Sequence, residues 1–195
     1  MSEKDNILNH QASQSSQVSG SQPLHDLIRD CIAQNRSAQK NLYDQFAPFI
    51  YGIIRRYLYN QEGADEVLND AFYKIFTNLH AYSFSGSFEG WMRRIVINTI
   101  TDHYRKYVKN EPAHKIDIEH TEVEINGDIV GKLGYKELLK LIHELPETQR
   151  AVFNLFVFEQ YSHKEIAEQL GINENNSRWQ LNDARRRLKE KIISM

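Results

Sequence analysis

The sequence predicts an all-α protein with two helical domains joined by a flexible acidic linker, the C-terminal domain being a helix-turn-helix. Apolar residues recur at spacings of three and four in several segments, which is the period of an amphipathic helix. No alternation of apolar and polar residues is long enough to indicate a strand. Only 9 glycines and 4 prolines occur among the 195 residues, which argues against a turn-rich all-β fold.

Composition narrows the class of protein. The chain is 41% apolar and 26% charged, which is ordinary for a globular protein, and its length allows one large domain or two small ones. Cys31 is the only cysteine, which excludes an intramolecular disulfide and a cysteine-cluster zinc site, so we expect no metal or other cofactor. No run approaches the roughly 18 apolar residues that span a bilayer, and residues 1–22 lack the apolar core of a signal peptide. We therefore expect a cytoplasmic protein.

The chain divides into four predicted segments: a disordered tail (1–22), an N-terminal domain (23–109), a linker (110–131) and a C-terminal domain (132–195). Residues 9–22 are almost free of apolar side chains and cannot offset the entropy of ordering. The linker carries six acidic residues against Lys115 alone, and the helical period stops there. A structureless stretch of about 20 residues is uncommon inside a compact domain, so we favour a linker over a packed loop.

The N-terminal domain contains a basic helix that follows an aromatic loop. This helix is predicted from about Ser87 to Val108, after apolar stripes at 42–57 and 64–79. Spacings of four, three and four place one polar set on a single face: Arg94, Asn98, Thr101 and Arg105. Beside this face lies the loop 82–88 with Phe84. Proteins that bind single-stranded nucleic acid typically place cationic side chains along the phosphate backbone and aromatic rings against unstacked bases. The alternative is that the aromatic rings, Trp91 above all, are simply core residues.

The preceding helix, 64–79, has an acidic and polar face opposite its apolar stripe. This face is formed by Asp65, Glu66, Asn69 and Asp70. Such a face is usually only solvated, but it also suits docking against a basic surface of a partner.

The C-terminal domain has the pattern of a helix-turn-helix. Ser162 and Glu165 form a capping box, the short helix that they start ends near Gly171, and Asn173 caps a last helix that runs to about Ile193. The last helix, from Glu174 to the end of the chain, has six Lys or Arg against three acidic residues. Its outer face includes Asn176, Arg178, Trp179, Asn182 and Arg185. We favour DNA binding in a major groove over a merely solvated basic helix.

Taken in order, these motifs resemble the bacterial sigma factors of RNA polymerase, in the small extracytoplasmic-function (ECF) group of the sigma-70 family. The resemblance covers residues from about 25 to 193. It rests on six segments of this sequence: 38–48, 64–76, 87–106, 145–146, 161–172 and 184–188.

The resemblance implies a function and a set of partners. Such a protein has no activity alone; it binds core RNA polymerase, directs it to certain promoters and helps to melt the start site. Asp65, Glu66, Asn69 and Asp70 are then expected to face the polymerase. Phe84, Arg94, Asn98, Thr101 and Arg105 are expected to handle the minus-ten strand of promoter DNA, and Asn176, Arg178, Trp179, Asn182 and Arg185 to lie in the minus-thirty-five groove. An anti-sigma factor, often membrane-bound, is a further expected partner, and no small-molecule substrate is expected.

The sequence departs from the family pattern at the start of the last helix. Ser177 stands where many relatives place an aliphatic core residue, which is expected to weaken packing behind the recognition helix. Trp179 stands where a small polar residue is common, so the promoter preference of relatives does not carry over.

Two other classes of function remain as alternatives. A stand-alone helix-turn-helix regulator would use its N-terminal half as a sensor or for dimerisation. An enzyme is disfavoured, because the eight histidines are scattered without metal-ligand spacing and no glycine-rich phosphate loop occurs.

Overall fold

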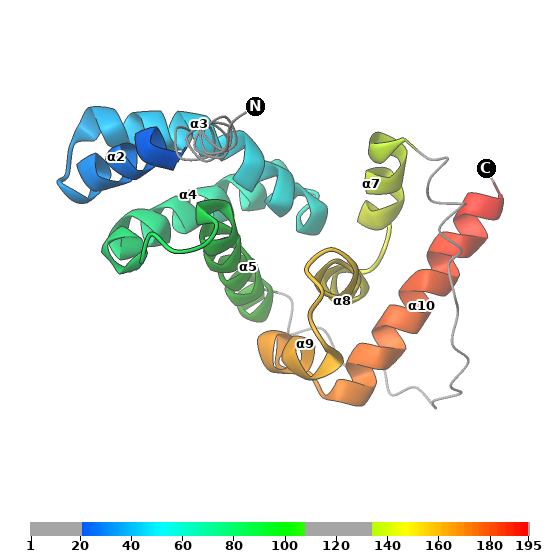
Figure 1. Cartoon of the computed structure of the whole chain (residues 1–195). Coiled ribbons are helices and arrows are strands. Elements are labelled where there is room, and N and C mark those ends of the chain that lie inside the picture. Colours follow the sequence, from blue (N-terminus) through cyan, green and yellow to red (C-terminus); the bar gives the residue numbers. More distant parts are fainter. Residues whose placement is uncertain (1–20, 108–133, 195) are drawn as a thin grey trace, which may run out of the picture.

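The computed structural model describes residues 21–107 and 134–194, and in these ranges every regular element is a helix (Figure 1). The predicted all-α fold is confirmed. The predicted linker lies outside the described residues, as does the predicted tail apart from its last two residues. Those two residues already belong to helix α2 (Ser21–Ile32), which therefore begins before the predicted boundary at Pro23.

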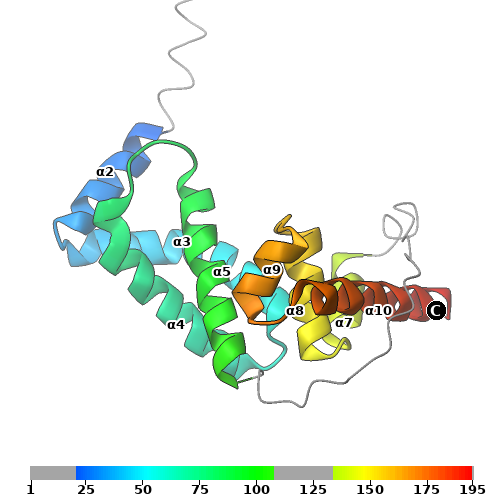
Figure 2. The same cartoon turned by 90° about the horizontal axis from the view of Figure 1, so that it is seen from below.

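The N-terminal half, residues 21–107, is built from four α-helices and one turn of 3-10 helix. After α2 come α3 (Arg36–Tyr57), α4 (Gln61–Asn78), η1 (Leu79–Ala81) and α5 (Phe88–Tyr107). Asn35 starts α3, because its Oδ1 accepts hydrogen bonds from the backbone N–H groups of Ser37 and Ala38. Helices α4 and α5 lie side by side, and α3 packs across both (Figure 2).

The apolar stripes of these helices meet in the core of the N-terminal half. Ile50, Ile54, Ile75 and Met92 are fully buried there. Cys31 is buried; burial, with a smaller contribution from the nearby Asp30 carboxylate, raises the pKa of its thiol to about 11. The thiol is therefore protonated and behaves as a small apolar group.

The C-terminal half, residues 134–194, contains α7 (Tyr135–His143), α8 (Glu147–Val157), α9 (His163–Leu170) and α10 (Glu174–Ile193). Helix α8 packs against α10, and α9 leads into α10 through a tight turn. Ile166, Leu170, Leu181 and Leu188 are buried between them, while Ile172 is half-buried.

The predicted helix ends are confirmed by their capping geometry. Ser162 and Glu165 exchange the two hydrogen bonds of a capping box. Gly171 adopts the left-handed conformation, with φ 66° and ψ 36°, which a residue with a side chain adopts only with strain. Asn173 Oδ1 accepts from the Asn176 N–H at 2.7 Å, and Ser87 Oγ accepts from the Gly90 N–H at 3.2 Å.

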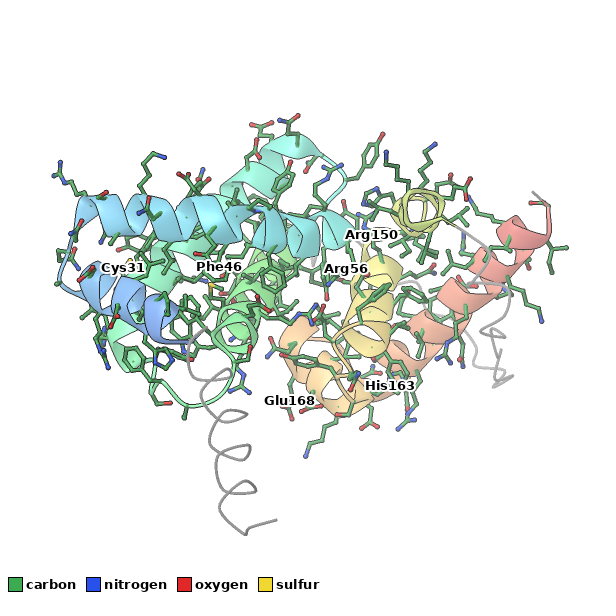
Figure 3. The ribbon with its side chains drawn as sticks, turned by 45° about the horizontal axis from the view of Figure 1, so that its top comes forward. Cys31, Phe46, Arg56, Arg150, His163 and Glu168 are labelled. Atoms are coloured by element: carbon green, nitrogen blue, oxygen red, sulfur yellow. The ribbon has the colours of Figure 1, made fainter. Side chains whose placement is uncertain are left out.

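The two halves are in contact. Helix α3 touches α7 and α8, and α5 touches α9. Figure 3 labels Arg56 of α3 and Arg150 of α8, which point toward each other's half at this joint. This contact determines which parts of the predicted DNA surfaces are open to solvent.

Candidate nucleic-acid interface

The polar face of α5 is only partly open. Arg94, Asn98 and Arg105 are exposed, as a nucleic-acid surface requires, but Thr101 is only 1% exposed. The Thr101 hydroxyl lies 3.0 Å from the Asn98 carbonyl oxygen and 3.0 Å from Gln169 Oε1 of α9. The structure therefore brings three of the four predicted α5 residues together on the surface and places the fourth under the other half.

Asp102 orients the most C-terminal arginine of this face. The Asp102 carboxylate accepts hydrogen bonds from Arg105, one turn along α5, and from Lys74 Nζ of α4 at 2.9 Å. Partial burial acts to raise the pKa of Asp102, but the hydrogen bonds from Lys74 and Arg105 outweigh it and hold that pKa below its ordinary value. Asp102 thus stays ionised and links α4 to α5 beside the predicted minus-ten surface.

The aromatic loop before α5 is held in a defined shape. The Tyr82 hydroxyl donates to the Gly86 carbonyl oxygen at 3.0 Å, which closes the loop. Phe84 has a φ of 56°, in the left-handed region that bulky side chains avoid. Its half-buried ring meets His25 edge-on at 5.2 Å and lies 5.5 Å from the Arg29 guanidinium. Strained backbone of this kind clusters at functional sites, which favours a role for the loop beyond packing.

The other aromatic residues around this loop pack in or against the core, in part as the alternative predicted. Phe88 is 3% exposed, and Trp91 is half-buried and stacks on it with ring centroids 5.6 Å apart. Tyr82 packs against both rings. Phe84 and Trp91 are both half-buried, and Phe84 lies on the side of the cluster that faces His25 and Arg29 of α2.

On α10, the helix predicted to enter the major groove, the five predicted residues differ in exposure. Arg178 is exposed and pairs with Glu174, whereas Asn176, Trp179, Asn182 and Arg185 are half-buried. The Arg185 guanidinium lies 5.5 Å above the Phe156 ring of α8. Cation–π contact of this kind limits the freedom of a long side chain before any ligand binds.

Two further arginines of α10 share one carboxylate. Asp183, whose side chain is 11% exposed, accepts hydrogen bonds from Arg186, Arg187 and Gln149. Partial burial acts to raise the pKa of Asp183, but these three hydrogen bonds outweigh it and lower that pKa. Part of the positive charge predicted for α10 is therefore already paired within the protein.

Ser177 and His163 form a polar pair behind the recognition helix. Ser177 is completely buried, and its Oγ lies 2.9 Å from Nδ1 of His163 in α9. The imidazole stacks on Phe156 with the ring centroids 4.8 Å apart. Burial lowers the pKa of His163, and Arg178 lowers it further, so the ring is neutral near pH 7. Sequence reasoning missed this pair, although a serine at a core position is a signal that a polar partner lies nearby.

The acidic face of α4 is on the surface. Asp65, Glu66, Asn69 and Asp70 are all exposed, as docking to a partner requires. Glu66 accepts a hydrogen bond from the Tyr107 hydroxyl at 3.3 Å and lies 4.0 Å from Lys106 Nζ. Tyr73, on the next turn of the same face, is 71% exposed and was not singled out from the sequence.

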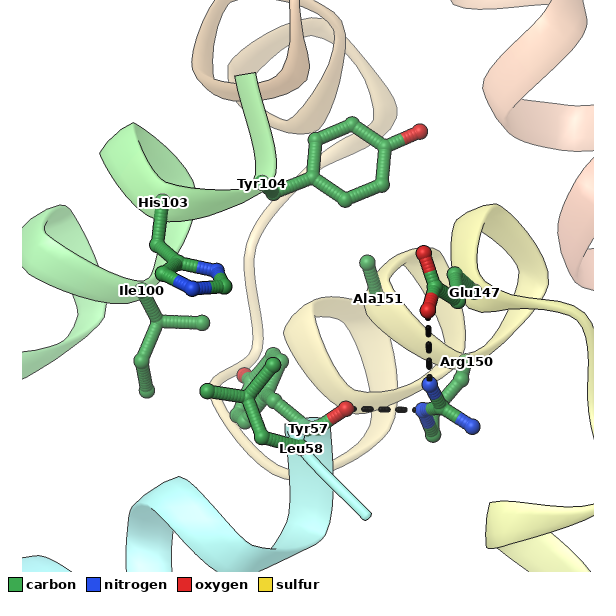
Figure 4. Close-up of a pocket in the computed structure, with 8 residues that line it drawn as sticks. All are labelled: Tyr57, Leu58, Ile100, His103, Tyr104, Glu147, Arg150 and Ala151. Carbon is green, nitrogen blue, oxygen red and sulfur yellow. Dashed lines mark hydrogen bonds and ion pairs between the residues drawn. The ribbon is translucent and has the colours of Figure 1, made fainter. Parts of the chain in front are cut away.

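Two hollows lie at the joint between the halves: an open groove of about 570 Å³, whose lining includes Glu66, His103 and Arg150, and a small cavity. Figure 4 shows the cavity there, lined by Tyr57, Leu58, Ile100, His103, Tyr104, Glu147, Arg150 and Ala151. Its volume is about 20 Å³, which is room for a single water molecule. Among the described residues, no cluster of three or more His, Cys, Asp or Glu side chains is arranged to hold a metal ion, and no helix is long and apolar enough to cross a membrane.

Comparison with known proteins identifies the family. Residues 42–109 match the model of sigma-70 region 2, and residues 135–188 match that of sigma-70 region 4. The two matches together cover more than half of the chain, and the chain belongs to the sigma-70 family of transcription initiation factors.

Individual relatives place the chain within that family. The sigma factor HrpL of Pseudomonas syringae pv. syringae is 26% identical over 145 residues, covering 71% of this chain and 78% of the relative. The ECF sigma factor SigM of Bacillus subtilis is 24% identical over 161 residues, covering 76% of this chain and 91% of the relative. A chain in the solved complex of the sigma factor RpoE with the anti-sigma factor NepR from Bartonella quintana is also similar. The match covers 80% of this chain and 96% of the matched chain, with a TM-score of 0.47 and 17% identity. The predicted ECF-type sigma factor is confirmed, and its function is promoter-directed transcription initiation.

Proposed function

We propose that three surfaces divide the work of initiation in this sigma factor. The acidic face of α4 binds core RNA polymerase, the loop 82–88 and α5 bind the minus-ten strand, and α10 enters the minus-thirty-five major groove. One observation carries the proposal: exposed arginines project from helices in different halves, and a separate exposed acidic face lies on α4. Two linked modules that engage separated sites on one DNA reinforce each other's affinity.

On the minus-ten side, the proposal assigns a charge role and a stacking role. Arg94 and Arg105 are exposed and suited to follow the phosphate backbone, while Asn98 between them offers an amide to a base edge. Phe84, with its partly accessible ring, is suited to stack on an unpaired base. Capture of an extruded base offsets an unstacking cost of a few kcal/mol, which helps the duplex to open.

On the minus-thirty-five side, Arg178 and Arg185 supply positive charge for phosphates or guanine edges, and Asn176 and Asn182 supply amides for base edges. The amide of Asn176 is already used within the helix, because its Oδ1 accepts from Gln180 Nε2 at 3.2 Å. Trp179 adds a half-buried ring that relatives with a small residue lack. We therefore expect a promoter preference of its own at this element.

We also propose where and with whom the chain works. Because its partner is bacterial core polymerase, it acts in the cytoplasm, and it contributes binding and positioning rather than a catalytic step of its own. As the family resemblance implies, an anti-sigma factor restrains it. RpoE of Bartonella quintana is one sigma factor solved with such a partner.

A core-binding and transcription assay tests this assignment. The double variant Asp65→Lys/Asp70→Lys is expected to lose binding to purified core polymerase and run-off transcription, because lysines on α4 repel a basic docking surface. Its control is Asp30→Lys/Asp44→Lys, which makes the same charge change at exposed positions on α2 and α3. Unchanged core affinity in the first variant refutes the docking role of α4. Tight binding of a homodimer to palindromic duplexes without polymerase supports the stand-alone regulator instead.

A further inference from the structure

The first helix of the N-terminal half contacts the ring that is assigned to base stacking. Helix α2 lies beside the loop 82–88 (Figure 2), and two of its side chains touch the Phe84 ring. The His25 ring meets Phe84 edge-on with the centroids 5.2 Å apart, and the Arg29 guanidinium lies over the Phe84 ring, 5.5 Å from its centroid. Neither His25 nor Arg29 belongs to the surfaces assigned above to DNA or to polymerase.

The neighbours of the Phe84 ring differ in how firmly they are held. Tyr82, with its ring centroid 5.2 Å from that of Phe84, is 5% exposed and is fixed by a hydrogen bond across the loop. His25 is half-buried. The Arg29 side chain is 60% exposed, and its Nη1 donates to Asp26, three residues earlier on α2, at 3.1 Å. Exposed pairs one helical turn apart are weak, so Arg29 is the neighbour of Phe84 that moves aside most easily.

The space between Phe84 and Arg29 is close to what a nucleobase requires. Planar groups stack about 3.5 Å apart, so a base between two of them requires about 7 Å. The Arg29 guanidinium then has to lift by about 1.5 Å from its present position, which is a small movement for a long, exposed side chain. Ser83 and Ser85 flank Phe84 in the sequence, and their exposed hydroxyls offer hydrogen bonds to the edge of such a base.

The charges around Arg29 favour a neutral base over a phosphate as its ligand. Asp26 accepts a hydrogen bond from Arg29, and Asp30 is the next residue along α2. Both of these acidic residues are exposed. Two carboxylates repel an anionic phosphate but do not repel a neutral base. Arg29 is therefore better suited to lie on the face of a base than to follow the DNA backbone.

We propose that Arg29 of α2 and Phe84 form a two-sided clamp for one unpaired nucleobase, with the guanidinium on one face of the base and the aromatic ring on the other. The proposal rests on the stacking role assigned to Phe84, and it extends the minus-ten surface from the loop 82–88 and α5 onto α2. Stacking on a ring and on a guanidinium plane depends little on which base is bound. Arg29 therefore strengthens the capture of an extruded base without selecting its identity.

A promoter fragment with a pre-opened stretch at minus ten tests the clamp. Each base of one unpaired strand is deleted in turn, and the measured quantity is the dissociation constant of the fragment from holoenzyme that contains the full-length chain. Phe84→Ala is expected to weaken binding of the intact fragment at least about fivefold, and to have no effect when one particular base is missing. That position identifies the base that stacks on Phe84.

Arg29→Gln is expected to weaken binding of the intact fragment about two- to fivefold, and to have no effect on the fragment that lacks this same base. Loss of a phosphate contact would instead weaken binding of both fragments alike. Arg29→Lys keeps the charge but removes the planar group, and it is expected to behave as Arg29→Gln does. The matched control is Arg36→Gln, at an exposed arginine that begins α3, which is expected to leave binding of both fragments unchanged.

The Arg29 variants are expected to unfold in urea as the parent chain does, because the side chain is exposed. Equal losses on the intact and the abasic fragment, full rescue by Arg29→Lys, or no loss in Arg29→Gln would each overturn the clamp. If Phe84→Ala acts through one base and the Arg29 variants do not, the stacking role of Phe84 stands and the clamp fails. If Phe84→Ala leaves binding of every fragment unchanged, the stacking role in the proposed function fails, and the clamp fails with it.

Discussion

The two basic helices, α5 and α10, differ in what holds their polar side chains. On α10 the exposed arginines pair within the helix, Arg178 with Glu174 and Arg186 with Asp183 and Glu190. On α5, Arg93 and Thr101 contact the other half of the chain instead. Exposed pairs between neighbouring turns are weak and exchange readily for phosphate, whereas contacts across the joint are lost only if two domains move. We therefore expect the exposed arginines of α10 to reach DNA without a domain movement, and Thr101 of α5 to be reached only when the halves separate.

The largest expected effect distinguishes an arginine at the joint from one on the free helix surface. Arg150→Ala removes a buried guanidinium that serves three carbonyl groups, and it is expected to lower the free energy of unfolding by about 3 kcal/mol. Arg186→Ala on α10 is expected to cost less than about 1 kcal/mol, because the Arg186 side chain is exposed and Asp183 keeps Arg187 and Gln149 as partners. Urea unfolding measures both, and equal losses would contradict the difference between joint and surface.

The second effect concerns the support behind α10. Ser177→Ala leaves Nδ1 of His163 without its hydrogen-bond partner in a largely buried setting, and it is expected to cost about 1–2 kcal/mol. The control is Ser194→Ala near the end of the helix, where the side chain is exposed and the expected change is within about 0.5 kcal/mol. A neutral Ser177→Ala would mean that the pair does not stabilise the helix-turn-helix.

The pH dependence of stability sharpens the comparison further. Burial lowers the pKa of His163, with further lowering by Arg178 and Arg185 that Glu174 opposes. Burial also lowers the pKa of His143, with Arg150 and Arg55 lowering it further, while its hydrogen bond to the Arg55 carbonyl opposes the shift.

As the pH falls, these histidines are therefore protonated in the unfolded chain before they are protonated in the folded one. Their contribution to the free energy of unfolding is fully present above a pH of about 6.5 and is lost as the pH falls through the folded-state pKa values. Unfolding curves between about pH 7.5 and pH 5.5 check this sign. His163→Gln is expected to reduce the pH dependence of the free energy of unfolding. If that free energy changes with pH as steeply as in the parent chain, His163 does not contribute to the dependence.

The smallest expected effect separates the DNA elements that the two helices read. Arg178→Ala is expected to weaken binding of the holoenzyme to promoter DNA about three- to tenfold and to reduce the salt dependence by about one ion, with core affinity retained. Arg105→Ala is expected to leave protection of the minus-thirty-five element unchanged and to impair opening at minus ten. If the footprints of both variants change at the same promoter element, the assignment of Arg178 and Arg105 to different elements is wrong.

Helix ends were readable from the sequence because their causes are local. Ser162 and Glu165 are three residues apart, Asn173 bonds to a residue three positions on, and Gly171 needs only its own backbone freedom. The exposure of Arg94 and Asn98 likewise followed from the helical period, which separates the polar face from the apolar one. The family resemblance added the order of the modules and the expected partners of each face, but not the state of any single side chain.

What lay beyond the sequence depends on residues far apart in the chain. Thr101 shares the period of Arg94 and Asn98, yet it is buried because Gln169, 68 positions later, packs on it. In the sequence, Glu159 cannot be told from an ordinary surface acid; in the structure, it is buried beside Arg56 and Arg93. From the sequence, Ser177 is expected to weaken packing; in the structure, it forms a hydrogen bond with His163.

The amino-acid order alone thus determined the all-α class, the helix ends that carry local caps and the two cationic helices, because hydrophobic period, capping and charge act within a few residues. Only the tertiary arrangement decided which side chains of each cationic helix are covered: Thr101 is buried on α5, and Trp179, Asn182 and Arg185 are half-buried on α10. The reason is physical: exposure depends on which distant surfaces pack together, and the ion pairs and hydrogen bonds that hold them have no local signature.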